Sequence, residues 1–168
     1  MKYTSASANK QIKIFEDRKN YLLQREQNDS TYILADDEKV EIPDYDFASC
    51  NEEIDALDRK IRTLKHALNV FNSTTLLPLG ITIDQALVEM AQLNNKLPRL
   101  DMMRKAKNKR RLSGMNAGRR DVAEYEYLNY DPAKAEEVYE ANLQRVQQIQ
   151  LALDKVNQTV EFEADLEE

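Results

Sequence analysis

Eight basic residues, with no acidic residue among them, lie between positions 104 and 120 of this chain. They are Arg104, Lys105, Lys107, Lys109, Arg110, Arg111, Arg119 and Arg120. Clusters of this kind neutralise phosphate groups, and aromatic side chains beside them can stack on nucleobases. Tyr125 and Tyr127 follow a few residues later. These ten residues therefore form a candidate contact surface for nucleic acid or for a protein partner.

The charge of the remaining chain favours a protein partner over nucleic acid. The whole chain has 24 bases and 30 acids, and subtracting the eight bases of the segment leaves 16 bases against 30 acids, a net charge of −14. Such a remainder repels nucleic acid and offers acidic surfaces to the basic segment of a neighbouring subunit. Two simpler interpretations also stand. The segment can be a solvated loop, and the tyrosines can pack a strand against a helix.

Other residue types that carry chemistry are scarce. The chain has one histidine, His66, and one cysteine, Cys50. One histidine cannot supply the two Glu-x-x-His pairs of a di-iron bundle, and the acids around Asp36 lack the spacing of a calcium loop. No glycine-rich phosphate loop, nucleophile elbow or zinc spacing is present. We therefore expect a non-enzymatic protein without a catalytic, cofactor-binding or metal site.

Four long helices are predicted to position the basic segment, over residues 5–27, 50–72, 83–107 and 132–160. In the second and third, apolar residues recur at spacings of 3, 4, 3, 4 and 3, which are the a and d positions of a heptad repeat. In the second helix these are Ile54, Leu57, Ile61, Leu64, Leu68 and Phe71, and in the third they are Ile83, Ala86, Met90, Leu93, Leu97 and Leu100. The fourth helix carries the polar Asn142 at such a position, and the first is interrupted by Lys19.

Helix starts are marked by capping residues. Ser49 with Glu52, and Thr82 with Gln85, have the spacing of capping boxes, and Asp131 precedes a proline at the first position of the fourth helix. Pro98 falls inside the third helix. Because the heptad spacing continues past it, we expect either a kink or a short restart there.

The segments between the helices predict a small β element. Residues 31–34 and 39–42 are rich in strand-forming types and flank a turn-prone centre, so residues 31–42 are predicted to form a β-hairpin. Residues 122–130 are rich in tyrosine and are predicted to form a strand. This strand would extend the hairpin to a three-stranded sheet, since an isolated hairpin is only marginally stable. Residues 104–120 are predicted to form an exposed loop.

The predicted fold is mainly α, an antiparallel four-helix, coiled-coil-like bundle with a small β-hairpin or three-stranded sheet, in one domain over residues 1–168. The low content of glycine and proline, 3 and 4 residues, agrees with long helices. Narrow heptad seams commonly find their missing partner in another chain, so we expect a homo-oligomer.

Neither a membrane-spanning segment nor a secretion signal is expected. No apolar run reaches the roughly 18–20 residues that cross a bilayer, and residues 1–15 contain no apolar signal core. A single cysteine excludes an internal disulfide. These features predict a cytoplasmic protein that does not enter the membrane.

The arrangement of these parts resembles a family of small bacterial proteins of unknown function, some of which carry the label septicolysin. The resemblance begins at residues 68–75 (LNVFNSTT), continues through residues 80–87 (GITIDQAL), and includes the step from strand to helix at residues 124–132. It implies a helical fold with a small β element and no established activity. The label implies a cytolysin, whereas the chain lacks a strongly apolar amphipathic helix suited to membrane insertion.

Overall fold

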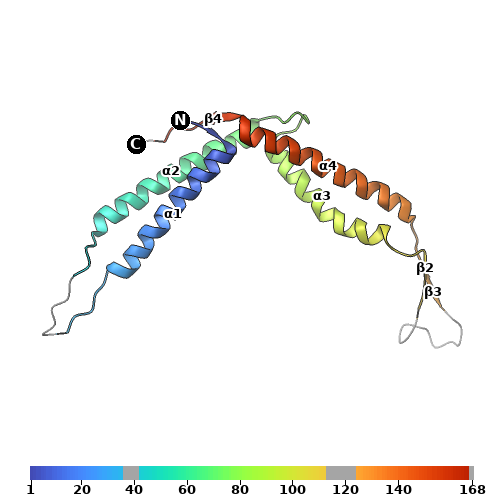
Figure 1. Cartoon of the computed structure of the whole chain (residues 1–168), viewed down its shortest axis with the longest axis horizontal. Coiled ribbons are helices and arrows are strands. Elements are labelled where there is room, and N and C mark those ends of the chain that lie inside the picture. Colours follow the sequence, from blue (N-terminus) through green and yellow to red (C-terminus); the bar gives the residue numbers. More distant parts are fainter. Residues whose placement is uncertain (36–41, 113–123, 167–168) are drawn as a thin grey trace. The chain divides into compact units, whose positions relative to one another are not determined.

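The computed structural model describes residues 1–35, 42–112 and 124–166 and is mainly helical, as predicted (Figure 1). It divides into two compact units, which are described separately below. The first comprises Met1–Thr75 and Asp154–Glu168, and the second comprises Leu76–Leu153. The sequence had indicated one domain. The four predicted helices are all present, and each begins and ends within three residues of its expected bounds.

The first unit is built on an antiparallel pair of helices, α1 (Ser5–Asp29) and α2 (Phe47–Thr74). The seam between them contains the residues that the heptad spacing singled out. Five of the six predicted a and d residues of α2 are buried, and Ile54 is half-buried. On α1 the buried residues include Ala8, Ile12 and Leu22. The periodicity of the sequence therefore located this seam correctly.

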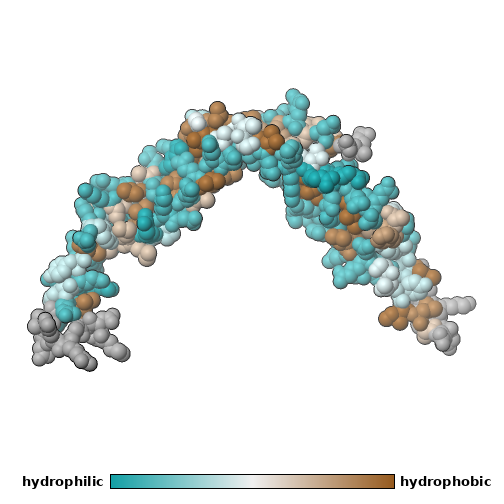
Figure 2. All heavy atoms as spheres, turned by 180° about the vertical axis from the view of Figure 1, so that it is seen from behind, coloured by the Kyte–Doolittle hydropathy of each residue, from teal (hydrophilic) through white to brown (hydrophobic). Residues whose placement is uncertain are grey.

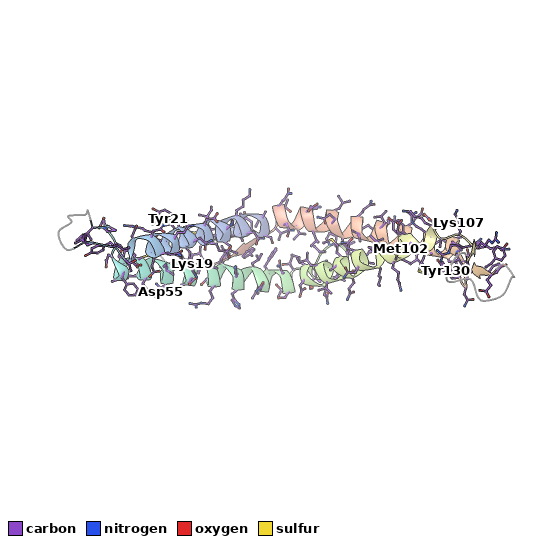
Figure 3. All side chains as sticks on the ribbon, turned by 90° about the horizontal axis from the view of Figure 1, so that it is seen from below. Lys19, Tyr21, Asp55, Met102, Lys107 and Tyr130 are labelled. Atoms are coloured by element: carbon purple, nitrogen blue, oxygen red, sulfur yellow. The ribbon has the colours of Figure 1, made fainter. Side chains whose placement is uncertain are left out.

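Ion pairs connect α1 and α2 alongside the seam. Lys19 Nζ donates to both carboxylate oxygens of Asp58, at 2.6 and 2.7 Å. In Figure 3, Lys19 lies between the two helices, whereas Tyr21 and Asp55 point away from the pair. The lysine that interrupts the apolar stripe of α1 thus finds a partner across the seam.

A two-stranded antiparallel sheet completes the first unit. Strand β1 (Lys2–Thr4) pairs with β4 (Glu161–Glu163), and Tyr3 lies opposite Phe162. The ring of Phe162 stacks on that of Phe71 in α2, with ring centroids 4.9 Å apart. No pattern in the sequence had indicated this sheet.

The start of α2 differs from the prediction. Its N-cap is Asp46, whose carboxylate accepts hydrogen bonds from the backbone N–H groups of Ala48 and Ser49 at 3.2 and 3.3 Å. The predicted cap at Ser49 is wrong, because the helix already begins at Phe47. A carboxylate at this position also interacts favourably with the positive end of the helix dipole.

The second unit contains α3 (Ile83–Arg104) and most of α4 (Pro132–Thr159), which lie side by side and antiparallel. The capping box of Thr82 and Gln85 is present, and Asp131 accepts a hydrogen bond from Ala133 N at 2.9 Å, as predicted for an N-cap. Helix α3 continues through Pro98. The alternative of a helix that ends and restarts there is therefore wrong.

Two charged contacts fix the pairing of α3 with α4. Arg145 donates to both carboxylate oxygens of Glu89, at 2.7 and 2.9 Å, and Arg104 Nη1 donates to Glu136 at 2.7 Å. Asn142, predicted at a seam position, is half-buried. Each unit thus contains one antiparallel helix pair, and the four-helix bundle stays a prediction.

Most of the strands lie at other positions than the sequence had predicted. The described residues 31–35 and 42–46 form no strand, and residues 36–41 of the expected hairpin lie outside the described part of the chain. Residues 122–130 do contain a strand, β3 (Tyr125–Tyr127), but it pairs with β2 (Lys109–Arg111), which had been assigned to a loop. Three adjacent bases gave no sign of a strand, because lysine is depleted in strands and the segment shows no apolar alternation.

Candidate functional site

The predicted contact surface is centred on strands β2 and β3 of the second unit. They pair antiparallel, with Lys109 opposite Tyr127 and Arg111 opposite Tyr125. Backbone hydrogen bonds from Leu112 N to Glu124 O and from Leu128 N to Asn108 O extend the ladder by one residue pair at each end. The sequence therefore predicted strand β3 and the basic residues correctly, but not that they pair with each other.

One face of this strand pair combines cations with aromatic rings. Because side chains alternate along a strand, Lys109, Arg111, Tyr125 and Tyr127 lie on the same face. Lys109 Nζ lies 4.0 Å from the ring centroid of Tyr125 and 5.3 Å from that of Tyr127. Both tyrosines are exposed, at 41% and 63%. The face thus offers a cation held over two rings, an arrangement that stacks against planar or apolar groups.

The opposite face is closer to neutral. Arg110 Nη2 pairs with Glu126 at 2.8 Å, and both side chains are exposed. Residues 105–112 and 124–130 together still carry five bases against two acids. The strand pair is therefore a basic surface, with its uncompensated charge mainly on Lys107, Lys109 and Arg111.

Arg104 and Lys105, at the end of α3, are already engaged within the unit. Arg104 pairs with Asp101 and Glu136, both at 2.7 Å, and its Cζ lies 4.1 Å from the ring centroid of Tyr139. The hydrogen bonds from Lys105 and then Arg104 hold the pKa of Asp101 below its ordinary value. These two bases fix the end of the helix pair and contribute little free charge to a phosphate ligand.

Three further residues were predicted to belong to the site: Lys107, Arg119 and Arg120. Lys107 is exposed beside the strand pair, as Figure 3 also shows. Arg119 and Arg120 lie outside the described residues. Among the residues described, no group of three or more side chains is arranged to hold a metal ion.

A small pocket of about 200 Å³ lies beside Cys50 in the first unit. Cys50 is buried, and its Sγ lies 3.9 Å from the carbonyl oxygen of Leu22. The half-buried Tyr45 donates to Glu26 at 3.1 Å, and desolvation together with this hydrogen bond raises the pKa of Tyr45 to about 12. With this pKa, the Tyr45 hydroxyl stays protonated near neutral pH, and the buried Cys50 packs against the backbone of α1. The pocket has the character of packing around the start of α2.

An apolar segment of the first unit is exposed, which had not been predicted. In the connection between α1 and α2, Tyr32, Ile33, Leu34 and Ile42 are exposed at 51%, 94%, 49% and 62%, and Phe47, the first residue of α2, is exposed at 63%. The prediction had assigned most of these residues to a hairpin, where one face would be covered. A signal was present in the sequence, because three consecutive apolar residues cannot all point to one face of a strand.

The part of the chain described is mainly helical, with two helix pairs and two small antiparallel sheets. None of the described helices combines the length and apolar character that crossing a membrane requires. No protein-family model matches the chain, and no curated protein is significantly similar to it.

The chain is similar in fold to a solved structure, that of a functionally unknown conserved protein from Corynebacterium diphtheriae. The sequences are 16% identical, the TM-score is 0.60, and the similarity covers 97% of this chain and 100% of the other. At this identity the likeness shows the fold alone. It is consistent with a family of unknown function, while the septicolysin label gains no support from these comparisons.

Proposed function

We propose that this chain is a structural or protein-interaction protein, without enzymatic activity, that self-associates through its heptad-patterned helices. One observation carries the proposal: large apolar side chains remain exposed at heptad spacing after the seam within each unit is filled. On α1 these are Ile14 and Tyr21, exposed at 58% and 55%, and on α3 they are Val88 and Met102, exposed at 58% and 70%.

Residues seven or fourteen positions apart lie on nearly the same face of a helix. In the view of Figure 2, apolar side chains lie among hydrophilic ones along the helices. A helix that carries a second row of apolar residues outside its first seam can pack against a further helix of another chain. Self-association of this kind requires no ligand or cofactor.

Molar mass in solution tests the proposal. We expect a mass above the 19.5 kDa of one chain at micromolar concentration, and a lower mass for the double variant Ile14→Glu/Tyr21→Glu, since burying two carboxylates in a helix contact is costly. The matched control, Gln24→Glu/Gln27→Glu, adds the same charge at two exposed positions of the same helix and leaves the mass unchanged. A strict 19.5 kDa monomer measured by light scattering contradicts the proposal.

A second candidate function, nucleic-acid binding, is favoured by the face on which Lys109 and Arg111 lie beside two exposed tyrosines. It requires affinity for a single-stranded oligonucleotide that falls steeply as salt increases, since phosphate contacts release counterions. Replacing Lys109, Arg110 and Arg111 by alanine should then abolish binding. Absence of binding at about 50 mM salt, where phosphate contacts are strong, removes this candidate.

A further inference from the structure

In the part of the chain that the structure describes, no further strand pairs with either edge of the strand pair β2–β3. In an antiparallel pair, residues alternate between those that hydrogen-bond to the partner strand and those whose backbone groups point outward. The bonds of Leu112 to Glu124 and of Leu128 to Asn108 fix the phase of this alternation. Lys109 and Arg111 are therefore the residues of β2 whose backbone N–H and C=O groups face outward. An open edge of this kind binds an additional extended segment.

A segment suited to this edge is present in the first unit. Residues 31–34 (Thr-Tyr-Ile-Leu) are rich in strand-forming types, yet they belong to no strand and, among the described residues, their backbone makes no hydrogen bond. Ile33, at 94% exposure, is the most exposed large apolar side chain of the described residues. The segment thus has both unpaired backbone groups and uncovered apolar side chains, which are the two properties that strand addition satisfies.

The charges around the two elements are opposite. Residues 29–35 and 42–47, around the segment, contain three acids, Asp29, Asp44 and Asp46, and no base. Residues 105–112, along the open edge, contain five bases and no acid. Residues 36–41 add four further acids and one base to the sequence of the connection. Complementary charge selects this partner and orients it, because two basic edges or two acidic connections repel each other.

We propose that residues 31–34 of one copy of this chain add as a third strand to the β2 edge of a second copy. This contact rests on the proposed self-association and assigns it a specific additional surface, distinct from the helix faces. The contact is heterologous, because a different surface is used on each copy. Two copies joined by one such contact leave one acidic connection and one basic edge unused, so further copies can add to form rings or open chains.

Complementation between two variants tests the contact. Ile33→Pro removes the backbone N–H in the centre of the incoming segment, and Ile33→Ala is its control because it keeps that donor. Lys109→Glu/Arg111→Glu reverses the charge of the edge, and its control, Lys96→Glu/Arg99→Glu, makes the same charge change at exposed positions of α3. Helix content by circular dichroism confirms that each variant is folded.

We expect each of the two variants to form only the species that the helix faces produce. In sedimentation velocity, the larger, concentration-dependent species of the unaltered chain should be missing. Mixed in equal amounts, the Ile33→Pro and Lys109→Glu/Arg111→Glu variants should regain one contact, since each supplies the surface that the other lacks. The regained species should stop at one added molecule and should dissociate as salt rises from about 50 to 500 mM, a range over which surface charges become screened.

Three outcomes overturn the contact. The variants associate like the unaltered chain; the mixture associates no more than its components; or the edge substitutions abolish oligonucleotide binding while association is unchanged, which assigns the strands to nucleic acid. The proposed function is tested separately, and it fails if the Ile14→Glu/Tyr21→Glu variant keeps the molar mass of the unaltered protein. If Ile14→Glu/Tyr21→Glu dissociates the protein while the edge variants do not, self-association through the helices stands and the strand contact does not.

Discussion

A single polar residue interrupts the apolar face with which α1 packs against α2. Lys19 occupies a position on α1 between the half-buried Phe15 and the buried Leu22, where the heptad pattern calls for an apolar residue. Its side chain is 29% exposed and pairs with Asp58, which is 45% exposed. A lysine at such a position fixes the register of two helices and lowers the stability that an apolar residue would provide.

Replacing Lys19 by leucine should therefore stabilise the first unit. We expect the free energy of unfolding to rise by about 1 kcal/mol, because a partly buried leucine contributes more than a half-exposed ion pair. Denaturation by urea, followed by circular dichroism, measures the change. Lys10→Leu, at an exposed position of the same helix, serves as the control and should change stability little. A decrease for Lys19→Leu would show that the ion pair, and not the apolar seam, dominates at this position.

At the scale of elements, the helices and strand β3 were predictable, and strands β1, β2 and β4 were not. The bounds of α2, α3 and α4 followed from a periodicity repeated over several turns, together with caps that lie within a few residues of each helix. Strands β1 and β4 are three residues long and pair residues 2–4 with residues 161–163. A period of two cannot be recognised over three residues, and no local pattern identifies a partner so far away in the sequence.

The start of α2 offers a direct comparison of a predicted and an observed cap. Asp46→Ala removes the carboxylate that accepts two backbone hydrogen bonds, and we expect a loss of about 1 kcal/mol in the free energy of unfolding. Ser49→Ala, at the predicted cap, should be nearly neutral, because Ser49 lies inside the first turn of the helix. Thermal or urea unfolding of both variants distinguishes them. Equal losses would indicate that the helix starts later in solution.

At the scale of the whole molecule, the composition was a better guide to the class of protein than to its site. Long helices with few turn-forming residues and no predicted catalytic cluster led to a mainly helical interaction protein, and the helical part of this prediction is confirmed. The candidate site was predicted as ten residues along the sequence. The structure separates Arg104 and Lys105, which stabilise the end of α3, from Lys109, Arg111, Tyr125 and Tyr127, which share one face. Only the pairing of β2 with β3 makes this distinction, and the sequence did not reveal that pairing.

The pairing of β1 with β4 has a consequence for the order in which the two units can fold during synthesis. The backbone nitrogen of Met1 donates to the carbonyl oxygen of Ala164 at 2.9 Å, so the first unit includes residues that are synthesised after the entire second unit. Domains commonly fold from the N-terminus onward during translation. Here α1 and α2 can pair early, but their sheet must wait until residues 161–163 have been made. On the ribosome, the second unit therefore has all of its residues before the first does, although the first unit begins the chain.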